Sequence, residues 1–241
     1  MVRQTYSNKL KRMTALAMLA ALAYVSVVII RIPNVGGFLT MDFKDVIITV
    51  GGMFFGPIAA VILALLVPFI EFLTISGTGP YGLIMNVLSS MTFALVASVI
   101  YKYKKSFLGA LLGLLSAVLA MTAVMMLANL LVTPYYTGMS REAVAAMIPK
   151  LLLPFNLTKA ILNASLTMML YKPLTNILKK TNLAPRKTAE SDKEIDKAKS
   201  VTLRTVLTFA ISLLIACAAI AVILVVWNGD ISFFDIFKSK L

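Results

Sequence analysis

A series of long apolar runs limits the fold of this chain more than any other feature. Each run has at least 18 residues, and about 20 apolar residues in an α-helix span the roughly 30 Å hydrocarbon core of a bilayer. The whole sequence is 60% hydrophobic, against about 45–50% apolar residues in soluble domains. The sequence therefore predicts an all-α, polytopic membrane protein. The long runs are residues 13–30, 58–75, 81–101, 107–133, 154–178 and 203–227.

A shorter apolar run, residues 45–55, ends at Gly56-Pro57. It is too short to cross a bilayer alone, so it must be tilted, extended at one end or shielded by protein. With it, residues 1–180 are predicted to form a six-helix membrane core. Residues 181–202 are charged and predict a cytoplasmic linker, and residues 203–241 predict a seventh transmembrane helix with an outer tail.

The distribution of basic residues predicts the orientation of these helices. Basic residues gather before the first run, directly after residue 101 and between residues 172 and 204, whereas the alternate loops hold few. Cytoplasmic loops carry the excess of Lys and Arg. The N-terminus is therefore expected on the cytoplasmic side of a multi-pass protein of the cell membrane. The net charge of +13 follows from these loops and does not indicate nucleic-acid binding.

Several classes of function lack their usual sequence signals. The chain has no histidine and a single cysteine, Cys217, so neither a transition-metal site nor a bound cofactor is expected. No nucleophile–base pair indicates an enzyme. No P-loop is present, so the chain is not expected to hydrolyse ATP itself.

One polar helix face stands out within the run that starts at Pro154. Asn156, Lys159 and Asn163 lie at i, i+3 and i+7, on the same side of a helix. A lysine in the bilayer costs several kcal/mol unless it faces protein or a water-filled cavity, so this face predicts a functional site. A structural ion pair or a hydrogen bond between helices is the alternative.

Other polar residues are expected at the same, outer end of the helices. Thr40, Asn86 and Asn129 fall there, and the stretch from Gly36 to Asp42 is expected to be a loop that either closes over a pocket or simply connects two helices. Such a pocket, mostly apolar with a few amides, suits a flat heteroaromatic ligand with carbonyl and imide edges. Glu71 is expected at the outer membrane boundary rather than paired with a lysine.

A small-residue pair marks the first apolar run. Ala17 and Ala21 are four residues apart and share one helix face, which permits another helix to approach closely. The approaching helix either belongs to a partner subunit or lies within the same chain.

The order and spacing of several short motifs give a more specific indication. Together these motifs resemble the substrate-binding S component of energy-coupling-factor (ECF) transporters, most closely the riboflavin-specific kind. The motifs are residues 38–45, Phe55-Gly56-Pro57, residues 77–82 with Asn86, Pro134-Tyr135-Tyr136 and residues 154–159.

The resemblance implies six helices, an outward pocket capped by the first outer loop, and riboflavin as the transported ligand. It implies docking, through Ala17 and Ala21, to a transmembrane coupling subunit (the T component), which works with two ATP-binding subunits. Its ligand-contacting positions correspond to Thr40, Asn129, Asn156 and Lys159. The further candidates are Leu39, Met41 and Asn86 from the matching motifs, and Asn163 from helical spacing alone.

Two alternatives to riboflavin uptake remain at this point. The chain could be an S component for another vitamin, such as folate or pantothenate, or a structural membrane subunit without transport activity.

Overall fold

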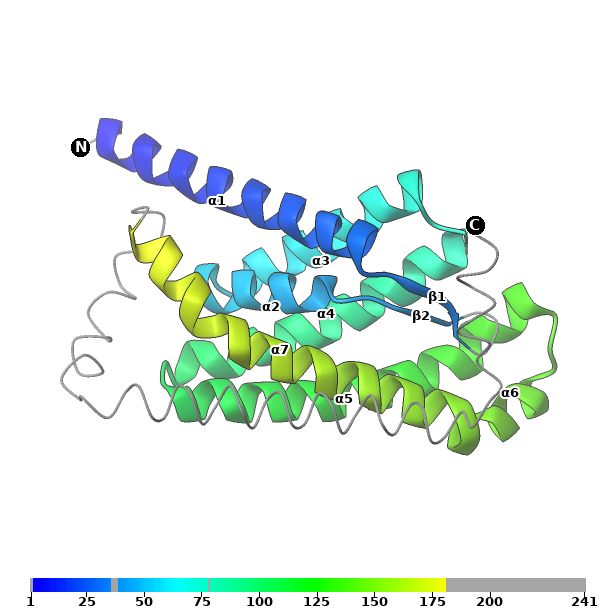
Figure 1. The fold of residues 1–241 in the computed structure, drawn as a ribbon. Helices are drawn as coiled ribbons and strands as arrows, with labels where there is room; N and C mark the ends of the chain where they lie inside the picture. Colours follow the sequence, from blue (N-terminus) through cyan, green and yellow to red (C-terminus); the bar gives the residue numbers. More distant parts are fainter. Residues whose placement is uncertain (1, 36–38, 78, 181–241) are drawn as a thin grey trace.

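The computed structural model describes residues 2–35, 39–77 and 79–180. The predicted linker at 181–202 and the predicted seventh helix and tail at 203–241 lie outside the described residues. The described part is a bundle of α-helices with one short hairpin, as Figure 1 shows, which confirms the all-α expectation. Its long helices are α1 (Val2–Ile29), α3 (Pro57–Thr74), α4 (Gly79–Tyr103), α5 (Phe107–Thr137) and α7 (Leu153–Lys180). Its shorter elements are β1 (Ile32–Val35), β2 (Leu39–Met41), α2 (Lys44–Phe55), α6 (Arg141–Met147) and the π-helical turn η1 (Ile148–Leu152).

Within the described residues, five helical segments are long and apolar enough to cross a membrane. Four of them belong to α1, α3, α4 and α5, and the fifth runs without a break through α6, η1 and α7, from Arg141 to Tyr171. Ser140 caps the start of α6, because its side chain accepts a hydrogen bond from the Ala143 amide. The predicted end of a helix before Pro134 is wrong, because α5 continues through Pro134 to Thr137.

The short helix α2 lies inside the bundle. It packs against α1, α3, α4 and α7, and all but one of its 12 residues are buried. At 1.5 Å per residue α2 is about 18 Å long, well short of the hydrocarbon core. Neighbouring helices surround α2 and shield it. Of the three arrangements that the sequence left open, the structure therefore shows the one in which protein shields the short helix.

Close approach of the backbones fixes α2 against α3 and α4. A Cβ atom added at Gly52 would lie 2.2 Å from Ser98 Oγ and 2.6 Å from Ala60 Cβ. The chain then turns from α2 into α3 at Gly56, where φ is +96°, a conformation that favours glycine. Pro57 follows as the first residue of α3, a position where its missing N–H leaves no helical hydrogen bond unmade.

The hairpin of β1 and β2 lies at one end of the bundle, near α6, and the N-terminus of α1 lies at the other end (Figure 1). The strands pair antiparallel, with Ile32 opposite Met41 and Val35 opposite Leu39. The sequence predicted an irregular loop here. The structure instead satisfies part of its backbone through strand pairing, and it buries the side chains of Leu39 and Met41.

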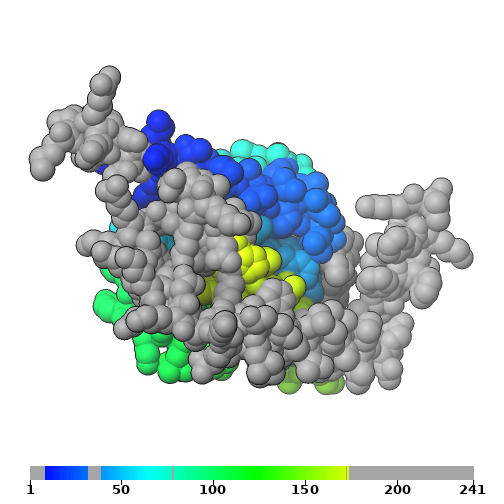
Figure 2. Space-filling model, turned by 60° about the vertical axis from the view of Figure 1, so that its left-hand side comes forward, coloured from blue at the N-terminus to red at the C-terminus, as the bar shows by residue number. Residues whose placement is uncertain are grey.

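Helix α1 lies at the surface of the bundle, and Figure 2 shows it (blue) exposed along one side. Ala15, Leu19, Ala23 and Val27 recur every four residues and are buried. Ala17 and Ala21 are both exposed on the outward side of the helix. Within the described residues, these two alanines therefore do not pack inside the bundle.

We predict that Gly52→Val lowers stability by about 1–3 kcal/mol, because the new side chain overpacks the contact of α2 with Ser98 and Ala60. Thermal unfolding of the protein purified in detergent measures the effect. The matched control is Gly77→Val, at an exposed glycine where an added Cβ would meet no atom within 4 Å. Equal unfolding temperatures for the two variants would contradict this account of the packing.

Candidate functional site

A cavity opens at the hairpin end of the bundle, between β2, α4, α5 and α7. Its enclosed volume is about 60 Å³, smaller than the usual range for ligand pockets. Its walls are mainly apolar, with a few amide, hydroxyl and ammonium groups. The lining residues are Leu39, Thr40, Gly82, Met85, Asn86, Ser89, Met125, Tyr136, Phe155, Asn156 and Lys159.

Lys159 links one wall of this cavity to the hairpin. Its ammonium group lies 3.0 Å from Asp42 Oδ2 and donates a hydrogen bond of 3.3 Å to the Thr40 carbonyl oxygen. The side chain is only 6% exposed, yet it lines the cavity. The two interpretations of this lysine are therefore compatible, because the same group forms a structural ion pair and faces the candidate site.

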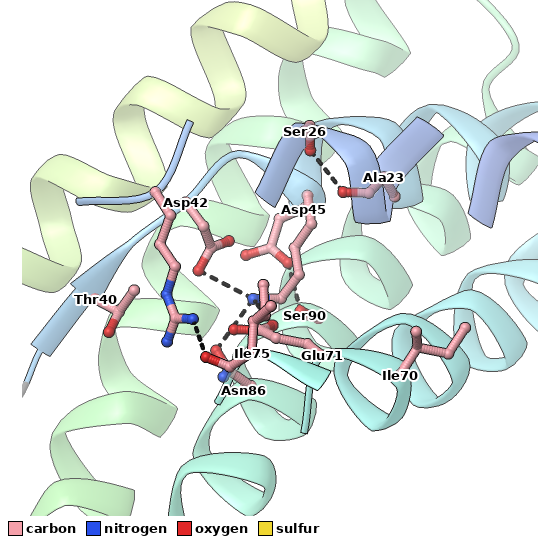
Figure 3. A network of polar contacts seen from close by, with 12 residues as sticks. Ala23, Ser26, Thr40, Asp42, Asp45, Ile70, Glu71, Ile75, Asn86 and Ser90 are labelled. Carbon is pink, nitrogen blue, oxygen red and sulfur yellow. Dashed lines mark hydrogen bonds and ion pairs between the residues drawn. The ribbon is translucent and has the colours of Figure 1, made fainter. Parts of the chain in front are cut away.

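Asp42 is the shared acceptor of a buried charge network. Its Oδ2 atom lies 3.0 Å from the ammonium nitrogens of both Lys44 and Lys159. Lys44 also lies 3.0 Å from Glu71 Oε2 and donates a 3.2 Å hydrogen bond to Asn86 Oδ1. Figure 3 shows Asp42, Glu71 and Asn86 converging from separate parts of the chain. The network thus ties the hairpin and α2 to α3, α4 and α7.

The charge of Asp42 is set by these neighbours. It lies in the connection between β2 and α2, outside the membrane-spanning helices. Full burial would raise its pKa, but the ammonium groups of Lys159 and Lys44 outweigh burial and hold the pKa well below its usual value. Asp42 therefore stays ionised at neutral pH and neutralises part of the charge of both lysines.

A second polar cluster lies beside this network. Asp45, on the first turn of α2, accepts hydrogen bonds from Ser90 Oγ and, at 3.4 Å, from Asn163 Nδ2. Asn163 is fully buried and does not line the cavity. It shares a helix face with Lys159 as predicted, but its described side-chain partner is a carboxylate of α2.

The predicted site residues divide into two groups. Leu39, Thr40, Asn86, Asn156 and Lys159 line the cavity, whereas Met41, Asn129 and Asn163 are buried outside its lining. Asn129 is satisfied within α5, because its Nδ2 donates to the Met125 carbonyl at 2.7 Å and its Oδ1 accepts from Thr133 at 2.9 Å. Contact of all eight residues with a ligand stays a prediction.

Four charged residues at the site were not chosen from the sequence as site residues: Asp42, Lys44, Asp45 and Glu71. The expectation that Glu71 is not paired with a lysine is wrong, because its side chain is 1% exposed and pairs with Lys44. One sequence feature could have identified three of these residues: Asp42, Lys44 and Asp45 place three charges at the start of an apolar run. A lone acid within the apolar run 58–75 was the second signal, because a charge inside a membrane segment usually has a partner.

Two aromatic rings flank the cavity at the ends of α4 and α5. Tyr81 and Tyr136 stack with ring centroids 6.1 Å apart and planes inclined by 27°. Tyr136 lines the cavity and Tyr81 is 38% exposed. Tyr136 was not among the candidate site residues chosen from the sequence. With the amides and the ammonium group, the ring gives the cavity both a flat apolar surface and hydrogen-bonding groups, the features that recognise a planar polar ligand.

Comparison with known proteins gives consistent matches over most of the described chain. The family model described as "ECF transporter, substrate-specific component" matches residues 11–171. The riboflavin transporter RibU of Staphylococcus aureus (strain TCH60) is 34% identical over 177 residues, which cover 70% of this chain and 93% of RibU. The riboflavin transporter FmnP of Bacillus subtilis (strain 168) is 26% identical over 164 residues, which cover 64% of this chain and 86% of FmnP.

The fold also matches a solved structure of the S component of a bacterial ECF transporter. The TM-score is 0.61 at 34% sequence identity, and the match covers 71% of this chain and 99% of the other.

The charge network generates a prediction about stability. Asp42→Ala leaves Lys159 without a carboxylate partner among the described residues, and breaking a buried ion pair on one side typically costs about 3–5 kcal/mol. We expect a large drop in the thermal unfolding temperature in detergent. Glu142→Gln on α6 is the control, because Glu142 is exposed and surface substitutions usually change stability by less than about 0.5 kcal/mol. A loss no larger than that of the control would contradict the importance of Asp42.

Proposed function

The chain belongs to the family of ECF transporter substrate-specific components, and from this premise we propose that it binds riboflavin from outside the cell with high affinity and serves its uptake. The observation that carries the proposal is the cavity between Lys159 and Asn156 on α7, Thr40 on the hairpin and Tyr136 on α5. Riboflavin has a flat ring system with carbonyl oxygens and an imide N–H. Ammonium and amide groups match that polar edge, and an aromatic ring matches the ring face. The names of RibU and FmnP as riboflavin transporters support this choice of vitamin.

The proposed riboflavin site comprises the residues named from the sequence, with Tyr136 added. Leu39, Thr40, Asn86, Asn156 and Lys159 line the cavity as it stands. Met41 lies on the hairpin that borders it, and Asn129 and Asn163 are polar groups of α5 and α7, two helices that contribute to its walls. Asn129 can contact the ligand only if its amide gives up a hydrogen bond to Met125 or Thr133 and forms one with the polar edge of the ligand.

Energy for transport is proposed to come from partner subunits, a T component and two ATP-binding subunits. The sequence shows no P-loop of its own. Ala17 and Ala21 on the outward side of α1 are the proposed contact with the T component, because small exposed residues on a membrane helix permit close helix packing. The proposed orientation places the N-terminus in the cytoplasm and the cavity on the outside, since the hairpin and the start of α1 lie at opposite ends of the bundle (Figure 1).

A ligand titration tests the proposed function directly. Riboflavin fluorescence should be quenched when the vitamin binds next to an aromatic ring in an apolar cavity, and the purified protein in detergent should saturate at one vitamin per chain. Folate and pantothenate are titrated in parallel by calorimetry. Preference for either vitamin would replace riboflavin as the substrate, and binding of none of the three would favour a structural membrane subunit.

Lys159→Ala should weaken riboflavin binding more than tenfold, because a hydrogen bond from a charged donor contributes about 1.5–3 kcal/mol. The same titration measures the loss, and Asn156→Ala and Asn129→Ala should act in the same direction. Lys150→Ala is the matched control, since Lys150 is exposed in η1 and does not line the cavity. Unchanged affinity in a folded Lys159→Ala protein would remove this lysine from the site.

The proposed docking face predicts a different pattern of loss. Ala17→Trp with Ala21→Trp should abolish riboflavin uptake by cells that express the coupling subunits, because two indole rings would hold a partner helix away. Riboflavin binding in detergent should be unchanged, since neither alanine lines the cavity. The control pair is Leu115→Trp with Leu119→Trp, which has the same spacing on exposed positions of α5. Normal uptake by the α1 variant would disprove docking through this face.

A further inference from the structure

The starting observation is that two buried lysines share one oxygen atom. Lys44 from α2 and Lys159 from α7 each lie 3.0 Å from Oδ2 of Asp42. Their ammonium groups are therefore close to each other and repel, and burial leaves little water to screen them. The position of Lys159, which lines the cavity, depends on where Lys44 places its own charge.

Glu71 of α3 is the second carboxylate that pairs with Lys44. Its Oε2 atom lies 3.0 Å from the Lys44 ammonium nitrogen, and its side chain is 1% exposed. Among the described residues, neither carboxylate oxygen of Glu71 has a hydrogen-bond partner, and Lys44 is its only ion-pair partner. Glu71 does not line the cavity.

Stability alone does not account for this arrangement. Removing a carboxylate and an ammonium group from water costs free energy that their mutual attraction often fails to recover. A buried Glu71 is therefore weak support for the fold as such. The negative charge of Glu71 attracts the Lys44 ammonium group toward α3. The Asp42 carboxylate can then pair more strongly with Lys159.

We infer that Glu71 is a positioning residue that acts through Lys44 and Asp42 to hold Lys159 on the carbonyl of Thr40, and so keeps the hairpin closed against α7. The inference deepens the proposed function, because Lys159 and Thr40 are part of the riboflavin site. No hydrogen bond or ion pair within the described chain joins Glu71 directly to Lys159, so the effect must pass through the two intermediate residues.

Neutralising Glu71 without changing its shape removes this effect. In Glu71→Gln, Lys44 keeps Asp42 as its only ion-pair partner within 4 Å among the described residues. The two ammonium groups then compete for one carboxylate, and Lys159 loses part of its hold on Asp42 and Thr40. The backbone amides of residues 39–43 should exchange with deuterium about threefold or more faster, as expected for a locally weakened segment.

The decisive variant removes both ends of the Glu71–Lys44 pair. In Glu71→Gln with Lys44→Met, Asp42 pairs with Lys159 alone and no second ammonium group competes. Exchange at residues 39–43 should return to within about twofold of wild type, a non-additive result that indicates coupling between the sites. A purely structural ion pair would also recover when both partners are removed, but its loss in Glu71→Gln would speed exchange throughout α2, α3 and α4 rather than mainly at residues 39–43.

The experiment measures hydrogen–deuterium exchange on full-length, ligand-free protein in detergent, with Glu142→Gln as the control for the same chemical change at an exposed site. Wild-type exchange in Glu71→Gln, equal acceleration throughout α3, α4 and α5, or no recovery in the double variant would each overturn the inference. If Glu71→Gln does not fold, a folded double variant with wild-type exchange at residues 39–43 supports it, and failure of both variants to fold overturns it.

Riboflavin titration of the same proteins separates this inference from the proposed function. Glu71→Gln should bind riboflavin several-fold more weakly, with the change mainly in the dissociation rate, because the hairpin closes less firmly. If wild-type protein does not bind riboflavin, the proposed function fails. The exchange experiment still tests the role of Glu71, because it uses no ligand.

Discussion

The arrangement around the cavity depends on one buried carboxylate, that of Asp42. Its position directly before α2 places it between a lysine of α2 and a lysine of α7, and it contacts both. Neither lysine would be tolerated in an apolar bundle without such a partner, because an unpaired buried charge is costly. The carboxylate therefore permits Lys159 to stand in the cavity wall as a charged hydrogen-bond donor, the property that a ligand site at this place requires.

The short helix α2 makes this charge cluster possible. Lys44 and Asp45 lie on its first turn, and Asp45 is placed where the helix dipole favours a negative charge. A helix that spanned the membrane would expose its charged first turn at the lipid interface. Since α2 is enclosed by α1, α3, α4 and α7, its charged end instead lies in the interior beside the cavity. The close contact at Gly52 is part of the same arrangement, because it draws α2 between α3 and α4.

The sequence predicted the features that depend on neighbouring residues, such as membrane helices. It did not predict side-chain pairs between residues that are far apart in the chain. Run lengths predicted the membrane helices among the described residues, because about 20 apolar residues in an α-helix span a bilayer. The ion pair of Glu71 was not predicted because its partner, Lys44, belongs to a different helix. The end of α5 was misplaced because Pro134 lies one turn before the terminus, where few helical hydrogen bonds remain to be lost. Asn156 and Lys159 were found from helical spacing, but spacing could not show that Asn163 pairs with Asp45.

The contacts of α1 indicate which part of the molecule can move when the cavity fills. Near the hairpin, Tyr24 donates a 2.9 Å hydrogen bond to Thr74 and Arg31 donates one of 2.6 Å to the Ile75 carbonyl. At the other end, Arg12 donates a 2.9 Å hydrogen bond to the Phe55 carbonyl. Helix α1 is thus attached to α3 and α2 along its length, although β1 follows it directly in the chain. Among the described residues, the contacts that hold the hairpin to the bundle include those of Lys159 and the packing of Leu39 and Met41. The contacts of α1 hold the exposed face with Ala17 and Ala21 on the bundle, so the proposed ligand entry and the proposed contact with a partner helix involve separate parts of the fold.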